Sequence, residues 1–127
     1  MMKMKRITKL LWEEWRKKAR GEKTKYGYLV KKLMQKFPNE KPPEEFMSLQ
    51  EYKILTALNG SERTITDIYR RTTIGYSDVH RIVHELAEKG WLEITGKKKH
   101  KMGKYCRITQ EGIKRVLEWQ RFHSAFL

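Results

Sequence analysis

The 127-residue chain has one cysteine, only three prolines and no long run of apolar residues. A single cysteine, Cys106, cannot form an internal disulfide bond, so the class of disulfide-stabilised secreted domains is excluded and a reducing compartment is favoured. The longest apolar runs span a few residues, far below the roughly 20 that cross a bilayer. No apolar segment of the kind found in signal peptides follows the basic residues at 1–6. We therefore expect a cytoplasmic protein that does not span a membrane.

Acidic residues are scarce relative to basic ones. The chain has 29 Lys and Arg residues against 15 Asp and Glu residues, which gives a formal net charge of +14. Hydrophobic residues make up 39% of the chain and aromatic residues 11%, enough to form a core, so the charge does not indicate a disordered polycation. The usual partner of a folded, strongly basic domain is a polyanion, and nucleic acid is the commonest one.

Catalytic and metal-binding motifs are also lacking. The sequence has no nucleophile elbow, P-loop, pair of catalytic carboxylates or H-E-x-x-H pattern. His80 and His84 stand four residues apart, a spacing that places two metal ligands on one helix face, but the sequence has no paired cysteines. We predict that the protein is not an enzyme, holds no metal and needs no cofactor. Cys106 is expected to be a small buried residue.

All three prolines fall within residues 38–45, and proline disfavours helix at its own position and at the preceding one. We therefore divide the chain into a helical N-terminal arm at residues 1–37, a linker at 38–45 and a compact module at 46–127. Apolar residues at helical spacing predict two helices in the arm, the first ending before Gly21 and the second at Phe37.

The arm combines apolar stripes with a high positive charge, since residues 1–36 include 13 basic and 3 acidic residues. Two helices of this size cannot fold alone, so their apolar stripes should pack on the module or on a second subunit. Packing is also the favoured role of Trp12 and Trp15, with stacking on single-stranded bases as the alternative. The basic residues around Gly21 are candidate phosphate contacts. They are Lys17, Lys18, Arg20, Lys23 and Lys25.

The module is predicted to be mainly α with a small antiparallel β-hairpin. Its patterns indicate helices at 48–58, 66–71, 77–89 and 109–123, with strands at 63–65, 91–95 and 105–108. Leu117 belongs to the apolar stripe of the last helix. Gly60 and Gly90 should end helices, and Gly75 should allow a sharp turn. The expected N-terminal caps are Ser48, Thr66 or Asp67, Ser77 and Thr109.

This order is that of a helix-turn-helix followed by a two-stranded wing. The major groove of B-DNA accepts one α-helix, whose first turns usually contact base edges. In the helix at 77–89, the residues Val79, Ile82, Val83 and Leu86 should face the core. The predicted DNA contacts around the opposite face are Tyr76, Ser77, Asp78, His80, Arg81 and His84. Arg81 is the best candidate for a bidentate contact to guanine.

The predicted wing is strongly basic, with six basic residues and no acidic residue between Lys97 and Arg107. Lysine binds phosphate as a point charge, so the wing should supply affinity with little sequence information. The candidate phosphate contacts are Lys97, Lys98, Lys99, His100, Lys101 and Lys104.

From Glu88–Leu92 through the basic hairpin to Tyr105–Gly112, the sequence resembles the winged helix-turn-helix regulators of bacteria and archaea, most closely those of the MarR and PadR types. In these regulators a glycine-hydrophobic pair, a wing and a Y-x-hydrophobic-T-x-x-G motif precede a long final helix. The resemblance covers about residues 49–122 and does not extend to the arm. It implies binding of double-stranded DNA by the second helix of the motif and, commonly, a homodimer on a near-palindromic site.

We predict a sequence-specific double-stranded DNA-binding protein that regulates transcription. One alternative is an architectural or replication-associated protein that uses the same module with little sequence preference. Another is an interaction module that binds an acidic protein or an RNA assembly. A regulator should bind one sequence far more tightly than random duplex at fixed salt, whereas an architectural protein should show a steep salt dependence without a preferred site.

Overall fold

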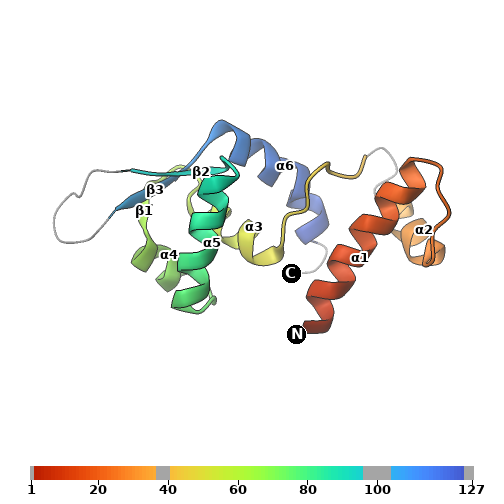
Figure 1. Cartoon of the computed structure of the whole chain (residues 1–127), viewed down its shortest axis with the longest axis horizontal. Helices are drawn as coiled ribbons and strands as arrows, with labels where there is room; N and C mark the ends of the chain where they lie inside the picture. Colours follow the sequence, from red (N-terminus) through yellow and green to blue (C-terminus); the bar gives the residue numbers. More distant parts are fainter. Residues whose placement is uncertain (1, 37–40, 96–103, 125–127) are drawn as a thin grey trace. The chain divides into compact units, whose positions relative to one another are not determined.

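The computed structural model describes residues 2–36, 41–95 and 104–124. The chain divides into two compact units, Met1–Ser48 and Leu49–Leu127. Unit 1 contains α1 (Met2–Ala19) and α2 (Gly27–Lys36), which pack against each other (Figure 1). After α1, Gly21 has a φ of 75°, in the left-handed region that glycine adopts without strain. The predicted end of the first helix is therefore confirmed.

Residues 41–48 pack on α1 within unit 1. The indole Nε1 of Trp12 donates a hydrogen bond to the carbonyl oxygen of Pro43 at 2.8 Å. The ring of Phe46 lies 5.4 Å from that of Trp12, between centroids. Trp12 and Trp15 are both buried. These two tryptophans therefore serve packing, as predicted, and offer no exposed ring face on which a base can stack.

Unit 2 contains the other elements in the predicted order (Figure 1). They are α3 (Leu49–Ala57), β1 (Arg63–Thr64), α4 (Ile65–Arg71), α5 (Tyr76–Glu88), β2 (Leu92–Ile94), β3 (Tyr105–Ile108) and α6 (Gln110–Ser124). The glycines predicted to end α3 and α5 have φ values of 77° at Gly60 and 80° at Gly90. None of the described helices is long and apolar enough to cross a membrane.

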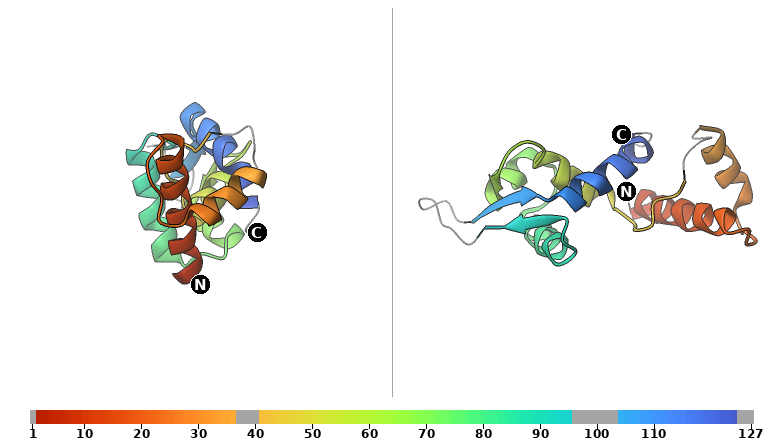
Figure 2. Two further views of the ribbon diagram at one scale, coloured as in Figure 1. Left: turned by 90° about the vertical axis from the view of Figure 1, so that its right-hand side faces the viewer. Right: turned by 90° about the horizontal axis from the view of Figure 1, so that it is seen from above.

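The sheet has three strands, where the sequence predicted a two-stranded hairpin and an isolated short strand. β3 pairs antiparallel with β2, with Leu92 opposite Ile108, and with β1 on its other edge, with Arg63 opposite Cys106. β2 and β3 run side by side in the right-hand view of Figure 2. β1 has only two residues. This length is too short to show the alternation of apolar and polar side chains from which its partner strand could be predicted.

The buried face of α5 is confirmed, since Val79, Ile82, Val83 and Leu86 are each at most 3% exposed. Cys106 is fully buried, also as predicted, and burial raises the pKa of its thiol to about 11. The thiol is therefore protonated and unreactive near neutral pH. Leu117 was predicted to lie on the apolar stripe of α6 but is 64% exposed.

The predicted cap of α4 was wrong. Its N-cap is Thr64, whose hydroxyl accepts a hydrogen bond from the backbone N–H of Asp67 at 3.1 Å. The sequence pattern predicts Thr66 or Asp67 in this role. Thr64 stands three residues before Asp67, the spacing that an N-cap hydroxyl needs, and the Asp67 carboxylate binds two arginines instead.

The predicted start of α5 also requires correction. The helix begins at Tyr76 with Gly75 as its N-cap, so Ser77 lies inside the first turn. Gly75 has a φ of −61°, which other residues adopt as easily, so the turn does not depend on the conformational freedom of glycine. At α6, by contrast, the predicted cap is confirmed, because the Thr109 hydroxyl accepts from the N–H of Gly112 at 3.0 Å.

Candidate nucleic-acid interface

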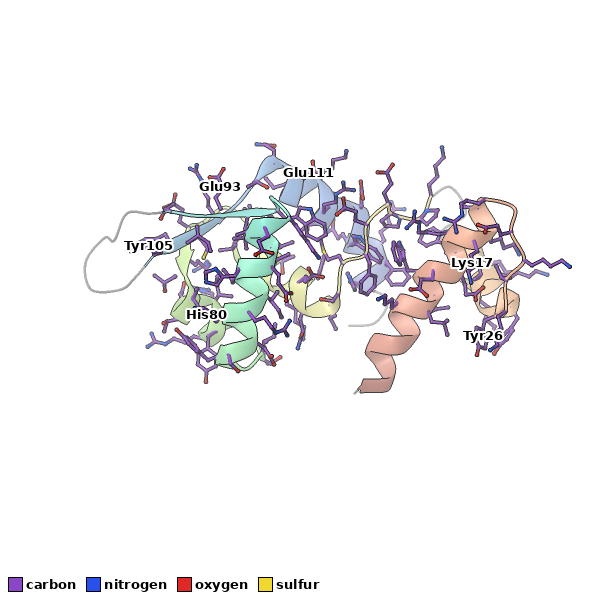
Figure 3. The ribbon with its side chains drawn as sticks, in the orientation of Figure 1. Lys17, Tyr26, His80, Glu93, Tyr105 and Glu111 are labelled. Atoms are coloured by element: carbon purple, nitrogen blue, oxygen red, sulfur yellow. The ribbon has the colours of Figure 1, made fainter. Side chains whose placement is uncertain are left out.

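The six residues predicted to contact DNA around α5 are all exposed. Ser77, His80, Arg81 and His84 lie opposite the buried stripe of the same helix. Tyr76 and Asp78 lie at its edges, since they stand three residues before Val79 and four before Ile82. His80, labelled in Figure 3, belongs to this exposed face. The structure thus brings the predicted residues together on one helix, and their contact with DNA stays a prediction.

Arg81 is held by two carboxylates of its own helix. Its Nη1 lies 3.2 Å from Oε1 of Glu85, and its Nη2 lies 3.3 Å from Oδ1 of Asp78. These hydrogen bonds, the one from Glu85 above all, raise the pKa of Arg81 further above its ordinary value. Together the two bonds hold the guanidinium along the surface of α5, between Asp78 and Glu85.

His80 and His84 lie one turn apart on the same face, with 4.6 Å between ring centroids. Each imidazole offers a donor and an acceptor to a base edge or a phosphate. Among the residues that the structure describes, no group of three or more His, Cys, Asp or Glu side chains could hold a metal ion.

Sequence reasoning missed Tyr69 of α4. This tyrosine is 42% exposed and packs edge-on against Tyr76, the first residue of α5, with 5.6 Å between ring centroids. Tyr76 is itself 49% exposed. The hydroxyls of such tyrosines can bind phosphate oxygens, so Tyr69 joins the candidate interface. The sequence signal for Tyr69 is its position next to buried Ile68, whereas the sequence pattern assigns α4 only the role of supporting α5.

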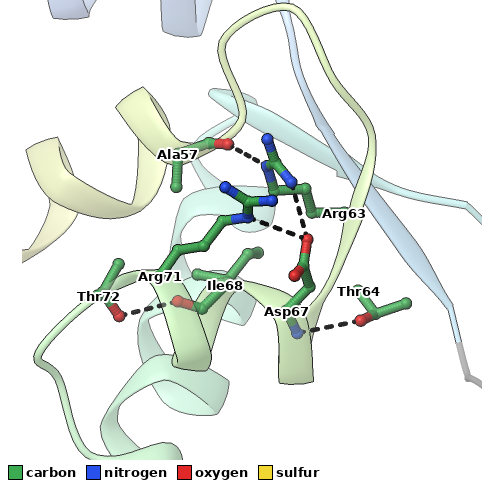
Figure 4. Close-up of polar contacts among 7 residues, drawn as sticks. All are labelled: Ala57, Arg63, Thr64, Asp67, Ile68, Arg71 and Thr72. Atoms are coloured by element: carbon green, nitrogen blue, oxygen red, sulfur yellow. Dashed lines mark hydrogen bonds and ion pairs between the residues drawn. The ribbon is translucent and has the colours of Figure 1, made fainter.

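A network of two arginines and one aspartate connects α3, β1 and α4 (Figure 4). Arg63 donates through Nε to the carbonyl oxygen of Ala57 at 2.6 Å and through Nη1 to Oδ2 of Asp67 at 2.9 Å. Arg71 donates to the same Asp67 oxygen at 3.4 Å. The hydrogen bond from Arg63 is the main reason that the pKa of Asp67 is lowered. The network helps to position α4, against which α5 packs.

A pocket of about 460 Å³ opens beside this network. Its lining residues are Lys53, Thr56, Ala57, Asn59, Arg63, Arg71, Thr72 and Thr73. Three of them are cationic, but Arg63 and Arg71 share the Asp67 carboxylate, and Arg63 also binds the last carbonyl of α3. The two guanidinium groups therefore serve to join α3, β1 and α4.

Most of the predicted wing contacts lie outside the described residues. These are Lys97, Lys98, Lys99, His100 and Lys101. Lys104 is exposed immediately before β3. Arg107 of β3 is exposed and pairs with Glu93 of β2, with 2.7 Å between Nη2 and Oε2.

The candidate phosphate contacts of the arm lie in unit 1. Lys17 (Figure 3), Lys18, Arg20, Lys23 and Lys25 are all exposed. Arg20 forms an ion pair with Glu22, and the ammonium of Lys25 lies 5.8 Å from the ring centroid of Tyr26. Binding of phosphate by these residues stays a prediction.

Comparison with known families adds to the geometry of unit 2, because residues 47–101 match the model of the MarR family. Unit 2 is therefore similar to the winged helix-turn-helix domains of the MarR family. The resemblance seen between Glu88 and Gly112 is thereby confirmed, and α4 and α5 are the two helices of the motif. Among curated proteins, none matches the sequence significantly.

Solved structures of MarR-type proteins share the fold. BpsR of Bordetella bronchiseptica, whose DNA binding is regulated by 6-hydroxynicotinic acid, is 19% identical with a TM-score of 0.57, over 80% of this chain and 75% of that one. MarR of E. coli is 17% identical with a TM-score of 0.54, over 79% and 77%. ZitR of Lactococcus lactis in complex with DNA is 14% identical with a TM-score of 0.56, over 78% and 73%. These similarities establish the fold.

Proposed function

We propose that the protein is a sequence-specific double-stranded DNA-binding regulator of transcription that inserts α5 into the major groove. The observation that carries the proposal is a MarR-type winged helix-turn-helix domain whose α5 buries one face and exposes six polar or aromatic residues around the other. MarR-family proteins are transcriptional regulators rather than enzymes, in agreement with the prediction that this chain is not an enzyme.

The proposed division of labour follows from residue chemistry. Tyr76, Ser77 and Asp78 stand in the first turn of α5, the part of a recognition helix that usually meets base edges. Arg81 and the two histidines follow on the same face and read bases or neighbouring phosphates. The wing lysines and the arm lysines neutralise phosphates, which adds affinity without sequence information.

We propose a homodimer as the DNA-binding form, located inside the cell with its DNA. The MarR resemblance implies a dimer, and we propose α6, together with the apolar stripes of the arm helices, as its interface. The exposure of Leu117 on α6 supports this assignment, because a second copy could cover its side chain. Two recognition helices would then meet half-sites about one helical turn apart.

Selection of duplexes from a random library, with the mass of the protein measured in solution, tests the proposal. We expect an enriched near-palindromic motif, a mass of two chains, and binding of the motif at least about 10³-fold tighter than random duplex at fixed salt. A steep salt dependence without an enriched motif would instead identify an architectural protein. If duplex DNA is not bound at all, the interaction module is the better description.

A further inference from the structure

The recognition helix is acidic in a chain that is strongly basic. α5 carries Asp78, Glu85 and Glu88 against a single arginine, Arg81, so its formal charge is −2, while the whole chain carries +14. DNA phosphates repel such a helix. Attraction to DNA of any sequence must therefore come from other parts of the chain, and α5 gains from entering the groove only where its side chains find matching bases.

The two carboxylates that hold Arg81 lie on opposite sides of it along α5. Asp78 is one turn before it and Glu85 one turn after it, and all three side chains are about half exposed. Exposed ion pairs of this kind contribute little net stability, so one of them can be exchanged for another partner at small cost. The two ion pairs hold the side chain of Arg81 along the surface of the helix.

The position of the bases relative to α5 determines which of the two carboxylates Arg81 leaves when it contacts DNA. The N-terminal turns of a recognition helix usually lie closest to the bases. A guanidinium that reaches for the N7 and O6 atoms of a guanine therefore moves toward Asp78 and away from Glu85. Arg81 can keep its bond to Asp78 during this movement, whereas its bonds to Glu85 at 3.2 and 3.4 Å have to break.

We infer that Glu85 is a specificity-determining residue that competes with DNA for Arg81, an inference that rests on the proposed function. On the preferred sequence, a guanine replaces the Glu85 carboxylate as the partner of Arg81. On other sequences no base replaces it, so Arg81 stays bound to Glu85 and is withheld from the phosphates that a free guanidinium would contact on any duplex. Glu85 thereby weakens binding to wrong sequences more than binding to the preferred one.

The test compares Glu85→Gln with the wild-type chain on a preferred duplex and on a random duplex at one salt concentration. Glutamine keeps the size of the side chain but removes the charge that holds Arg81. We expect affinity for the random duplex to rise by about 3- to 10-fold, because the freed Arg81 can contact phosphates of any sequence. Affinity for the preferred duplex should change less than about 2-fold, because Arg81 already contacts guanine there and the exposed ion pair that it gives up is weak. The specificity ratio should therefore fall.

Glu88→Gln is the matched control, because Glu88 is exposed on the last turn of the same helix and the bonds described for Arg81 do not involve it. It removes the same charge and should alter both affinities by the same small factor. A second control places Glu85→Gln in an Arg81→Ala background, where it should no longer change the specificity ratio.

If Glu85→Gln and Glu88→Gln changed the specificity ratio equally, Glu85 would act only through its contribution to net charge, and the inference would be overturned. So would a ratio that Glu85→Gln still changes when Arg81 is absent. If the wild-type chain itself prefers no duplex, the proposed function fails together with this inference. If the wild-type preference is clear but survives Glu85→Gln, only the inference fails.

Discussion

Replacing Gly112 by alanine should lower the free energy of unfolding of unit 2 by about 3 kcal/mol or more, one of the largest effects expected from any single substitution. A Cβ atom at this position would overlap the carbonyl oxygen of Trp91 and would lie 2.9 Å from the carbonyl carbon of Trp91 and 2.8 Å from Cγ1 of Ile108. Two of these three atoms belong to the backbone and cannot rotate away.

The close approach at Gly112 joins the start of β2 to the start of α6. The backbone N–H of Thr109 donates to the carbonyl oxygen of Trp91 at 3.1 Å, and the Thr109 hydroxyl donates to that of Gly90 at 2.6 Å. The N–H of Gly112 donates in turn to the same hydroxyl. Any side chain on Gly112 would separate these segments, so the T-x-x-G part of the sequence motif has a packing origin.

Chemical denaturation of the full chain, followed by circular dichroism, measures this effect. Gly75→Ala is the matched control, since a Cβ there meets nothing within 4 Å and the φ of −61° suits alanine. Its stability should change by about 1 kcal/mol or less. The packing argument would be refuted by a Gly112→Ala protein as stable as the Gly75→Ala protein.

Arg81→Ala should reduce affinity for the preferred duplex by about 10- to 100-fold, while affinity for a random duplex changes little. This loss comes from the bidentate contact to guanine. Asp78 and Glu85 also lose their shared cation, which should weaken both duplexes by a similar small factor. Specificity should relax at one or two base positions, which binding to a set of duplexes with single base changes will identify.

Lys104→Ala is the control for a lost positive charge, because Lys104 is exposed at the base of the wing. It should weaken binding to the preferred and the random duplex by the same factor. It should also reduce the slope of log affinity against log salt concentration by about one. If Arg81→Ala also weakened both duplexes equally, Arg81 would be a phosphate contact and the assignment of base reading to this residue would be wrong.

The order of elements in unit 2 was predictable because each has a strong local signal. The buried stripe from Val79 to Leu86 follows the helical period, and Gly60 and Gly90 end their helices with positive φ. The caps of α4 and α5 were less predictable, since several residues near each start can accept a backbone N–H. At α4, the position of Arg63 and Arg71 around Asp67 leaves Thr64 as the cap.

The sequence predicts which residues of α5 form the candidate interface, but it does not predict the ion pairs among them. The spacing of Asp78, Arg81 and Glu85 already contains the pairs three and four residues apart that the structure shows. The prediction of a contact to guanine instead assigns the charge of Arg81 wholly to DNA. Tyr69 was missed for a different reason, because its contact with Tyr76 depends on how α4 packs against α5, and no pattern within either helix contains that contact.

Entry of α5 into the major groove can be measured by the reactivity of a single introduced thiol. Cys106 is fully buried with a thiol pKa of about 11, so it should not react with an alkylating reagent near neutral pH. Ser77→Cys places a reactive thiol in the first turn of α5, and Ser61→Cys places one in the exposed loop between α3 and β1.

We predict that saturating preferred duplex slows alkylation of the Ser77→Cys protein by at least about 10-fold, because the bases and backbone of the groove cover this position. Alkylation of the Ser61→Cys protein should be nearly unchanged by the same duplex. If the Ser77→Cys thiol reacted equally fast with and without bound duplex, α5 would not be the helix in the groove, and Arg81 could not read a base from it.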